Sequence, residues 1–412
     1  MSTGELNARV IKRSTVVAAV AAMTIAQIAS VMGIALFPVI APRLAIELGV
    51  APALIGYQIS LVYGAATIGS PLMSFAVARW GACRATQVGL ACGAVAMLLA
   101  LTASITALAF ASVLLGISMT LMTPASTHIL FRFSPPQHRN FIFSLKQTGV
   151  PLGWMIMALA APGITLAFGW RWAVALVLVV VIATVLALQP VRAQWDDDRR
   201  RDVSVRVNPI TGLAALWRLP VLRWVATASF ALSFVQLCLA TFLVTLLVEE
   251  AGYDLVTAGV MLSLVQVSGV GGRMLWGWIA DRTGDSLLWL RRLATTTAIC
   301  CVVMAFLQPA WPLWVLALFL VIFGAASVGW NGLFIAEVAR CSPRGSVSVA
   351  MSAAMTWNFG GILVGPAVFA TVFKLTASYT LTYGLLAIVA LAGVVSLLLS
   401  RTAARREPIH HA

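Results

Sequence analysis

Acidic residues are the scarcest charged groups in this sequence, with only 13 Asp and Glu among 412 residues. Charged residues of both signs make up 10% of the chain, whereas 61% of it is apolar and the mean hydropathy is +0.98. A soluble domain typically carries about 25% charged residues. This composition excludes a water-soluble globular protein and indicates a polytopic membrane protein.

The sequence also lacks the residue clusters that catalysis or metal binding requires. Its six cysteines show no Cys-x-x-Cys spacing and fall mostly in apolar segments, which favours packing over redox or metal chemistry. There is no cluster of His and Asp residues and no long catalytic loop. We therefore expect no enzymatic activity, no metal site and no cofactor.

Twelve apolar runs are long enough to cross about 30 Å of hydrocarbon. They predict an all-α membrane protein with twelve transmembrane helices. The ninth run is the weakest, because Arg291 and Arg292 shorten it. The runs are 15–41, 53–78, 85–103, 105–131, 141–168, 172–190, 222–248, 255–280, 288–308, 312–338, 346–373 and 379–400.

The 27 basic residues are distributed unevenly between alternate loops. Arg43, Arg171 and Lys374 fall in odd-numbered loops, and Lys146 and Arg273 fall inside predicted helices. All the others lie in the two tails or in even-numbered loops. The positive-inside rule then predicts that both termini are cytoplasmic, in an inner or plasma membrane. The net charge of +14 thus reflects topology, and we expect no nucleic-acid partner.

A charge-rich segment, residues 191–219, divides the chain into two predicted six-helix halves, 1–190 and 220–412. The halves are related, because SFAVARWGACR (74–84) and GWIADRTGDSL (277–287) align Arg79 with Arg282 and Gly81 with Gly284. We interpret 191–219 as a cytoplasmic linker. Its end, 210–219, is either a helix lying on the membrane surface or plain solvated chain.

The spacing Gly277-x-x-x-Asp281-Arg282-x-Gly284 resembles the loop motif of the major facilitator superfamily (MFS), and FGWRW at 168–172 is also typical of that family. The resemblance extends over the whole chain through the helix count, the repeat and the orientation. It implies two pseudo-symmetric six-helix bundles that transport a solute by alternating access, in a chain expected to act as a monomer in the lipid bilayer.

The resemblance further implies that the second, fifth, eighth and eleventh helices form the contact between the bundles. Small residues let helices approach closely and slide. We therefore expect glycines of these helices at the contact, with ordinary tight packing as the alternative. The glycines are Gly149, Gly153, Gly269, Gly271, Gly272, Gly360, Gly361 and Gly365.

The first half departs from the family pattern. Ser74 and Ala78 replace the glycine and the aspartate of the loop motif, and Ser112 stands four residues before Gly116, where many members place an arginine. Proton antiporters for drugs usually rely on that arginine. Together with the lack of a carboxylate in mid-membrane, these departures weaken the alternative that the protein exports drugs.

Lys146 and Arg273 carry the main functional hypothesis. At 1.5 Å per residue they lie roughly 9 and 12 Å inside the inner boundary of the membrane. Without an intramembrane acid to pair with, the two cations favour an anionic substrate, and the planar fork of arginine suits a carboxylate. The alternatives are that Lys146 extends to the headgroups and that Arg273 binds carbonyl groups in a purely structural role.

Arg273-x-x-Trp276-Gly277 also resembles the eighth helix of the oxalate:formate antiporter and monocarboxylate porter group, where the arginine binds the carboxylate. The match is partial, because Gly269 stands where monocarboxylate porters often have an aspartate. The second cation of the oxalate carrier, on the eleventh helix, is also missing here.

Other polar and aromatic residues are predicted to line the substrate cavity, with bonding to a neighbouring helix as the alternative for each. The segment SVGWNG, residues 327–332, is predicted to be a locally loosened helix at substrate depth. The cavity candidates are Gln27, Tyr57, Gln58, Tyr63, His128, Gln147, Gln236, Gln266, Trp330, Asn331, Trp357 and Asn358.

Two further sets of residues are assigned to coupling and gating. His128 and Glu337 are the candidates for proton coupling, unless the substrate carries its own proton or anions are exchanged without protons. Near the inner surface, a charge cluster is expected to latch the outward-open state, mainly from the second half because the first half offers no acid there. The latch candidates, besides Glu337, are Gly277, Asp281, Arg282, Gly284, Arg340 and Arg344.

The sequence therefore predicts a secondary transporter for a small organic anion, working by proton symport or anion exchange. An exporter of drugs or other solutes is the alternative within the same family. A membrane scaffold or receptor that transports nothing is the alternative from another class, but it has no need for two unpaired intramembrane cations.

Overall fold

The computed structural model describes residues 13–134, 139–199, 219–309, 311–342 and 347–406. All regular secondary structure in these ranges is helical, which confirms the predicted fold class. The first half contains α1 (Arg13–Leu48), the 3₁₀ turn η1 (Pro52–Leu54), α2 (Ile55–Trp80), α3 (Ala82–Ala100), α4 (Ile105–Phe133), α5 (Arg139–Gln147), α6 (Gly149–Phe168), α7 (Trp170–Leu188) and α8 (Arg192–Trp195). The second half contains α10 (Pro220–Glu249), α11 (Leu255–Thr283), α12 (Ser286–Met304), α13 (Leu313–Ser327), α14 (Asn331–Cys341), α15 (Val347–Thr376) and α16 (Tyr379–Arg406).

Eleven of the predicted spans are helical segments that are long and apolar enough to cross a membrane. The remaining predicted span coincides with α2, whose 26 residues extend over about 39 Å. Two spans are interrupted. The span at 141–168 breaks at Thr148, between α5 and α6, and the span at 312–338 breaks between Ser327 and Asn331, which confirms the loosened helix expected there.

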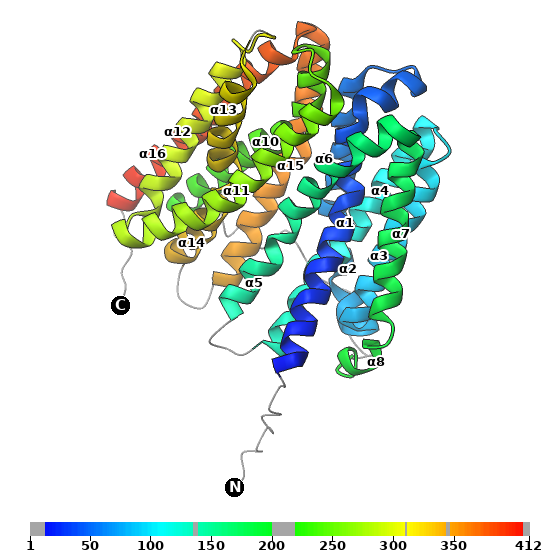
Figure 1. The fold of residues 1–412 in the computed structure, drawn as a ribbon. Helices are drawn as coiled ribbons and strands as arrows, with labels where there is room; N and C mark the ends of the chain where they lie inside the picture. The colour runs from blue at the N-terminus through cyan, green and yellow to red at the C-terminus, as the bar shows by residue number, and fades with distance from the viewer. Residues whose placement is uncertain (1–12, 135–138, 200–218, 310, 343–346, 407–412) are drawn as a thin grey trace.

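The helices form two groups, one drawn in blue to green and the other in green to red (Figure 1). The described ends of α1 and α16 lie on one side of the molecule, which we call the terminal side, and the opposite side is the far side. The groups meet where α2 packs on α15, α6 on α11 and α1 on α10. In chain order, α2, α6, α11 and α15 are the second, fifth, eighth and eleventh spans, as the family resemblance implies.

The glycines expected at this contact lie elsewhere. Those of α6 pack on α1, where a Cβ atom on Gly153 would lie 2.9 Å from Val31 Cβ. In α11, Gly272 packs on Ala325 of α13 and Gly269 on Val328 just after it, while nothing lies within 4 Å of Gly271. The glycines of α15 pack on Phe230 and Phe234 of α10. The expectation is wrong for this conformation, because all of these glycines except Gly271 pack against neighbouring segments of the same half.

Two other glycines stand between the halves, toward the far side. A Cβ atom on Gly259 of α11 would lie 2.1 Å from the carbonyl oxygen of Ala158 in α6. A Cβ atom on Gly56 of α2 would lie 2.3 Å from the carbonyl oxygen of Pro366 in α15. Only a residue without a side chain allows backbones to approach this closely.

The contact between the halves is closed on the far side. At the far ends of α2 and α15, the hydroxyls of Tyr57 and Thr371 are 2.9 Å apart, and Lys374 Nζ lies 5.0 Å from the centre of the Tyr57 ring. Toward the terminal side, a cavity of about 620 Å³ lies between α2, α4 and Phe359 of α15. We refer to it as the central cavity.

Candidate functional site

Arg273 lies at the interruption between α13 and α14. Its Nε donates a hydrogen bond of 3.2 Å to the carbonyl oxygen of Val328, the first residue after α13. Where a helix ends, carbonyl groups lose their partner four residues later and need another donor. The guanidinium of Arg273 reaches one such carbonyl, and one turn later in α11 Trp276 Nε1 donates to Ala325 O at 2.8 Å.

The same interruption holds a small polar network. Asn331 Nδ2 donates to Val328 O at 3.3 Å and to Gln236 Oε1 at 3.2 Å. Trp330, which is fully buried, donates from Nε1 to the same Gln236 oxygen at 3.1 Å. The structure thus brings Arg273 and Asn331 together at Val328 O, and Gln236 of α10 connects Asn331 to Trp330.

The guanidinium of Arg273 keeps unused donors. It is half-buried, and within the described ranges neither terminal nitrogen has a hydrogen-bond partner and no carboxylate forms an ion pair with it. The bond to Val328 supports the structural alternative for Nε. The terminal nitrogens, which form the fork that binds oxyanions, remain available to a ligand.

Lys146 is 3% exposed at the last turn of α5. Its Nζ donates to Gln147 Oε1 at a long 3.4 Å, and no carboxylate of the described residues pairs with it. Burial this complete does not fit a side chain that extends to the headgroups. Three residues after Lys146, Gly149 packs against Gln27 of α1. Gln27 is 2% exposed, and its Oε1 lacks a hydrogen-bond partner among the described groups.

Lys146 lies in the span formed by α5 and α6, Arg273 lies in the span formed by α11, and α6 packs on α11. Gly259 of α11 touches Ala158 of α6 near the far side. Toward the terminal side, Arg273 is fourteen residues beyond Gly259 and Lys146 twelve before Ala158, about 21 and 18 Å along their helices. Neither lines the central cavity.

The central cavity has mostly apolar walls. Thr67, Thr120 and Thr127 line it, but their hydroxyls donate to carbonyls of their own or a neighbouring helix, which leaves their methyl groups available to face the cavity. His128 also lines the cavity. The other polar side chains in the lining are those of Tyr63 and Thr123.

Several other cavity candidates contact a neighbouring helix or residue. Tyr57 belongs to the far-side contact, and Gln147, which is exposed, accepts from Lys146. Asn358 is 5% exposed and donates to Ser229 O of α10 at 3.3 Å, while Trp357 lies 5.8 Å from the Phe230 ring. Gln266 is buried in α11 at 4% exposure.

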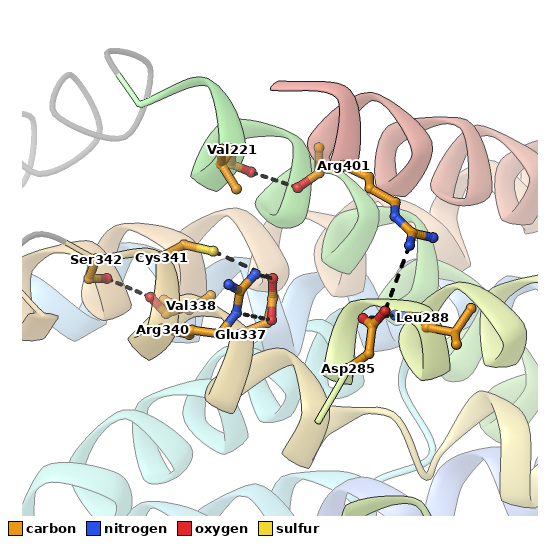
Figure 2. Close-up of polar contacts among 10 residues, drawn as sticks. Val221, Asp285, Leu288, Glu337, Val338, Arg340, Cys341, Ser342 and Arg401 are labelled. Carbon is orange, nitrogen blue, oxygen red and sulfur yellow. Dashed lines mark hydrogen bonds and ion pairs between the residues drawn. The ribbon is translucent and has the colours of Figure 1, made fainter. Parts of the chain in front are cut away.

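The coupling candidates are both paired. Glu337 is fully buried and accepts from both Nε, at 2.9 Å, and Nη2 of Arg340, with Cys341 Sγ 3.5 Å away (Figure 2). Beside it, Arg401 of α16 lies 4.0 Å from Asp285 (Figure 2). His128 Nε2 lies 2.7 Å from Asp198 Oδ2. Of the two, only His128 reaches the central cavity.

The latch candidates are not brought together in this conformation. Asp281 and Arg282 are exposed, and Arg282 stacks on Trp278 at 3.9 Å. Gly284 ends α11 with φ +67°, a left-handed conformation that favours glycine, and Gly277 is helical. Arg340 pairs with Glu337 on its own helix, and Arg344 lies outside the described residues.

The linker supplies acids to the first half, which differs from the expectation that no acid is available there. Asp196 accepts hydrogen bonds from the backbone amides of Cys83, at 2.7 Å, and Arg84, at 3.0 Å, and so caps α3. Asp197 lies 2.5 Å from Arg132 of α4, and Trp195 is buried. In the sequence, three aspartates directly follow Trp195. This pattern could have indicated that the segment docks on the first half, although it is equally typical of a charged linker.

Known proteins resemble this chain in sequence and in fold. A family model described as Major Facilitator Superfamily matches residues 23–366. The probable nitrate/nitrite transporter NarK2 of Mycobacterium tuberculosis is 32% identical over 199 residues, which are 48% of this chain and 48% of that protein. An uncharacterized MFS-type transporter of the same species is 26% identical over 168 residues, 40% of this chain and 36% of that protein. The matches thus cover half or less of these relatives.

Two solved structures share the architecture over 94% of this chain. A peptide transporter POT has a TM-score of 0.76 at 14% identity, with 95% of its chain covered. The Escherichia coli fucose:proton symporter FucP has a TM-score of 0.59 at 15% identity, with 99% covered. Because the family model extends over most of the spans, the chain belongs to the Major Facilitator Superfamily of membrane transporters.

Proposed function

We propose that this protein is a secondary transporter for a small planar anion, with carboxylates as the first candidates. One observation carries the proposal: Lys146 and Arg273, in membrane-spanning helices of opposite halves, have no carboxylate partner among the described residues. Leaving a buried charge unpaired costs several kcal/mol. An anion bound between the halves removes that cost, so binding of the anion and approach of the halves favour each other.

The geometry at Arg273 favours a planar ligand. The bond from Nε to Val328 O fixes one edge of the guanidinium, so the terminal nitrogens present a fixed pair of donors. A carboxylate accepts from such a pair with two oxygens. The partial resemblance to the oxalate:formate and monocarboxylate group supports the same substrate class.

Nitrate and nitrite form a second candidate class, favoured by the similarity to the probable nitrate/nitrite transporter NarK2. Both ions share with a carboxylate a single negative charge and coplanar oxygens. The chemistry at Arg273 and Lys146 is therefore the same for either class. The space around the bound anion decides between them.

In the proposed mechanism, the terminal side faces the cytoplasm, as the distribution of basic residues indicates. The far-side contact between Tyr57 and Thr371 is then the outer gate, and this conformation faces inward. Asp281 and Arg282 belong to a latch that assembles when the inner side closes. Transport is either exchange of two anions or symport with a proton, for which His128 is the coupling candidate inside the central cavity.

The two unpaired cations do not support the alternative functions, a drug exporter or a scaffold that transports nothing. An exporter of cationic drugs needs an acid in mid-membrane, and Glu337, the buried acid of α14, is already paired with Arg340. A scaffold or receptor without transport gives no role to two unpaired cations on opposite halves.

The proposal is tested by a ligand screen on the purified protein, with thermal unfolding as the readout. Mono- and dicarboxylates, nitrate, nitrite and chloride are compared on wild type, Arg273→Ala and the control Arg292→Ala. A ligand at a hundred times its Kd stabilises the protein by about 2.7 kcal/mol. We expect stabilisation by one planar anion class in wild type and in the control only. Equal stabilisation of Arg273→Ala would remove this residue from the site.

A further inference from the structure

A second cavity, of about 590 Å³, lies on the terminal side of the first half, where α2 ends, α3 begins and α8 packs beside them. We call it the arginine cavity, because four arginines line it. None of them belongs to the proposed transport site. They are Arg79, Arg84, Arg192 and Arg199.

The two acids in the wall of the arginine cavity are already engaged. Asp196 Oδ1 and Oδ2 accept the backbone amides of Cys83 and Arg84 at the start of α3, where the helix dipole also favours a negative charge. Asp197 lies 2.5 Å from Arg132 Nη1, and Arg132 itself does not line the cavity. These contacts hold the two carboxylates in place, and the four arginines of the cavity wall outnumber the two acids.

The arginines themselves have no carboxylate partner in the part of the chain that the structure describes. Arg84 Nη1 makes one long bond, 3.5 Å, to Gln87 Oε1. Arg79, Arg84 and Arg199 are exposed and Arg192 is half-buried. Several like charges around one cavity repel each other, so the cavity is a site that an anion stabilises.

We propose that the arginine cavity binds the phosphate of an anionic phospholipid headgroup. Guanidinium forks match phosphate oxygens and hold them with charge-assisted hydrogen bonds. The cavity lies at the ends of membrane-spanning helices, at headgroup depth, and half-buried Trp80 in its wall suits that interface. Basic pockets between helices on the cytoplasmic side are suited to such headgroups.

The bound lipid has a structural consequence. Arg192 is on α8, in the linker, whereas Arg79 and Arg84 are on α2 and α3. A headgroup held by all three ties the start of the linker to the first half. Anionic lipid should therefore stabilise the docked linker, which a free charge on the surface does not do.

Lipid binding to the full-length protein in detergent tests the proposal, by native mass spectrometry with phosphatidylglycerol and phosphatidylcholine as probes. The test variant is Arg84→Gln with Arg192→Gln, and the matched control removes two basic residues from the other half, Arg291→Gln with Arg292→Gln. We expect phosphatidylglycerol affinity to fall at least about tenfold in the test variant. The control should bind as wild type does.

Two further experiments distinguish a lipid phosphate from free phosphate, and loss of binding from misfolding. Millimolar inorganic phosphate should leave lipid binding unchanged; displacement of the lipid would show that a free phosphate is the ligand instead. Arg84→Lys with Arg192→Lys, which keeps the charge, should recover part of the affinity. Equal loss in the test and control variants, or no preference for phosphatidylglycerol over phosphatidylcholine, overturns the proposal.

Discussion

Arg273 and Lys146 are held differently, although both are cations within membrane-spanning helices. Arg273 has one edge bonded to Val328 O, so its plane is fixed before a ligand arrives. Lys146 has a single long bond to its neighbour Gln147 and is otherwise enclosed. In the site that we propose, Arg273 would therefore orient the anion, and Lys146 would supply a point charge to it.

Replacing Arg273 by lysine separates charge from orientation. Arg273→Lys keeps the cation but loses the bond to Val328 and one of the two bonds to the anion, worth about 1.5 kcal/mol or roughly tenfold in affinity. We expect KM for transport of the preferred anion into liposomes to rise about tenfold, with a smaller change in the maximal rate. Arg273→Gln should abolish transport. An unchanged KM in Arg273→Lys would show that the fork does not bind the anion.

The presence of both cations inside the membrane is predictable from the sequence, because every other basic residue can be assigned to a loop or tail. Their partners are not predictable. Val328 O becomes an acceptor only because the helix breaks there, and the docking of Gln236 on Trp330 depends on how α10 packs against that break. The positions of Tyr57 and Asn358 likewise depend on which helices meet, which residue type alone does not determine.

At the level of elements, the linker helix α8 and the start of α3 form one unit. Asp196 reaches the α3 amides only because Gly81 leaves room for it: a Cβ atom at Gly81 would lie 2.3 Å from Asp196 Cγ. Gly81 also has φ +94°, which other residues rarely adopt. Gly169 also has a positive φ, +92°, directly before a helix, α7. A Cβ atom on Gly169 would have no neighbour within 4 Å.

This pair of glycines allows a matched comparison. Gly169→Ala should lose only the conformational term, about 1–3 kcal/mol. Gly81→Ala should lose that term and also the cap on α3, for a further cost of about 1–3 kcal/mol. Apparent unfolding temperatures in detergent measure both. In an Asp196→Ala background the two glycine substitutions should cost the same, and a persistent difference would rule out Asp196 as its cause.

The start of α11 provides a prediction about pH. The hydroxyl of Thr257, followed by the backbone amides of Thr257 and Val256, donates to the Asp254 carboxylate and lowers its pKa. The stabilisation is therefore present above the unfolded pKa of about 3.9 and is lost as the pH falls through the lower folded value.

Asp254→Asn tests this sign, because asparagine caps a helix without titrating. Wild type and Asp254→Asn should unfold at similar temperatures near neutral pH, and Asp254→Ala should be less stable by about 1 kcal/mol. Below about pH 4 the advantage of wild type over Asp254→Ala should shrink, while that of Asp254→Asn persists. A parallel decline of wild type and Asp254→Asn would contradict the assignment.

The sequence predicts most elements correctly but not their interruptions and contacts. Twelve apolar runs gave the spans, and two glycines around Trp330 indicated the break before α14. The break at Thr148 and the docking of residues 195–198 on the first half gave no comparable signal, because polar residues next to a span are equally typical of a solvated loop. Segment 210–219 lies outside the described residues, so its two interpretations stay open.

On the scale of the whole molecule, the two halves contact each other closely on the far side. The far side is closed by backbone contacts at Gly56 and Gly259, while the latch candidates Asp281 and Arg282 are exposed on the terminal side. In the alternating-access mechanism that we propose, these two sets of contacts exclude each other. A change that weakens only one of them should move the population toward the other conformation.

Gly259→Ala weakens the far-side contact alone. Its Cβ atom would lie 2.1 Å from the carbonyl oxygen of Ala158 and 2.8 Å from Pro162 Cγ, so α6 and α11 must separate. A cost of about 1 kcal/mol changes the ratio of conformations about fivefold. We expect a cysteine at position 371, introduced as Thr371→Cys in a Cys92→Ser background, to react severalfold faster with an impermeant maleimide added on the far side.

Gly163→Ala is the matched control, because it changes the same residue type on α6 where nothing lies within 4 Å. It should leave the labelling rate of position 371 unchanged. If the preferred anion bridges Lys146 and Arg273, it should bring the two halves together. It should then change the labelling rate of position 371 both with and without Gly259→Ala. Equal labelling in Gly259→Ala and Gly163→Ala would show that the close approach of α6 and α11 does not control the outer gate, and would place that control at Gly56 and Tyr57.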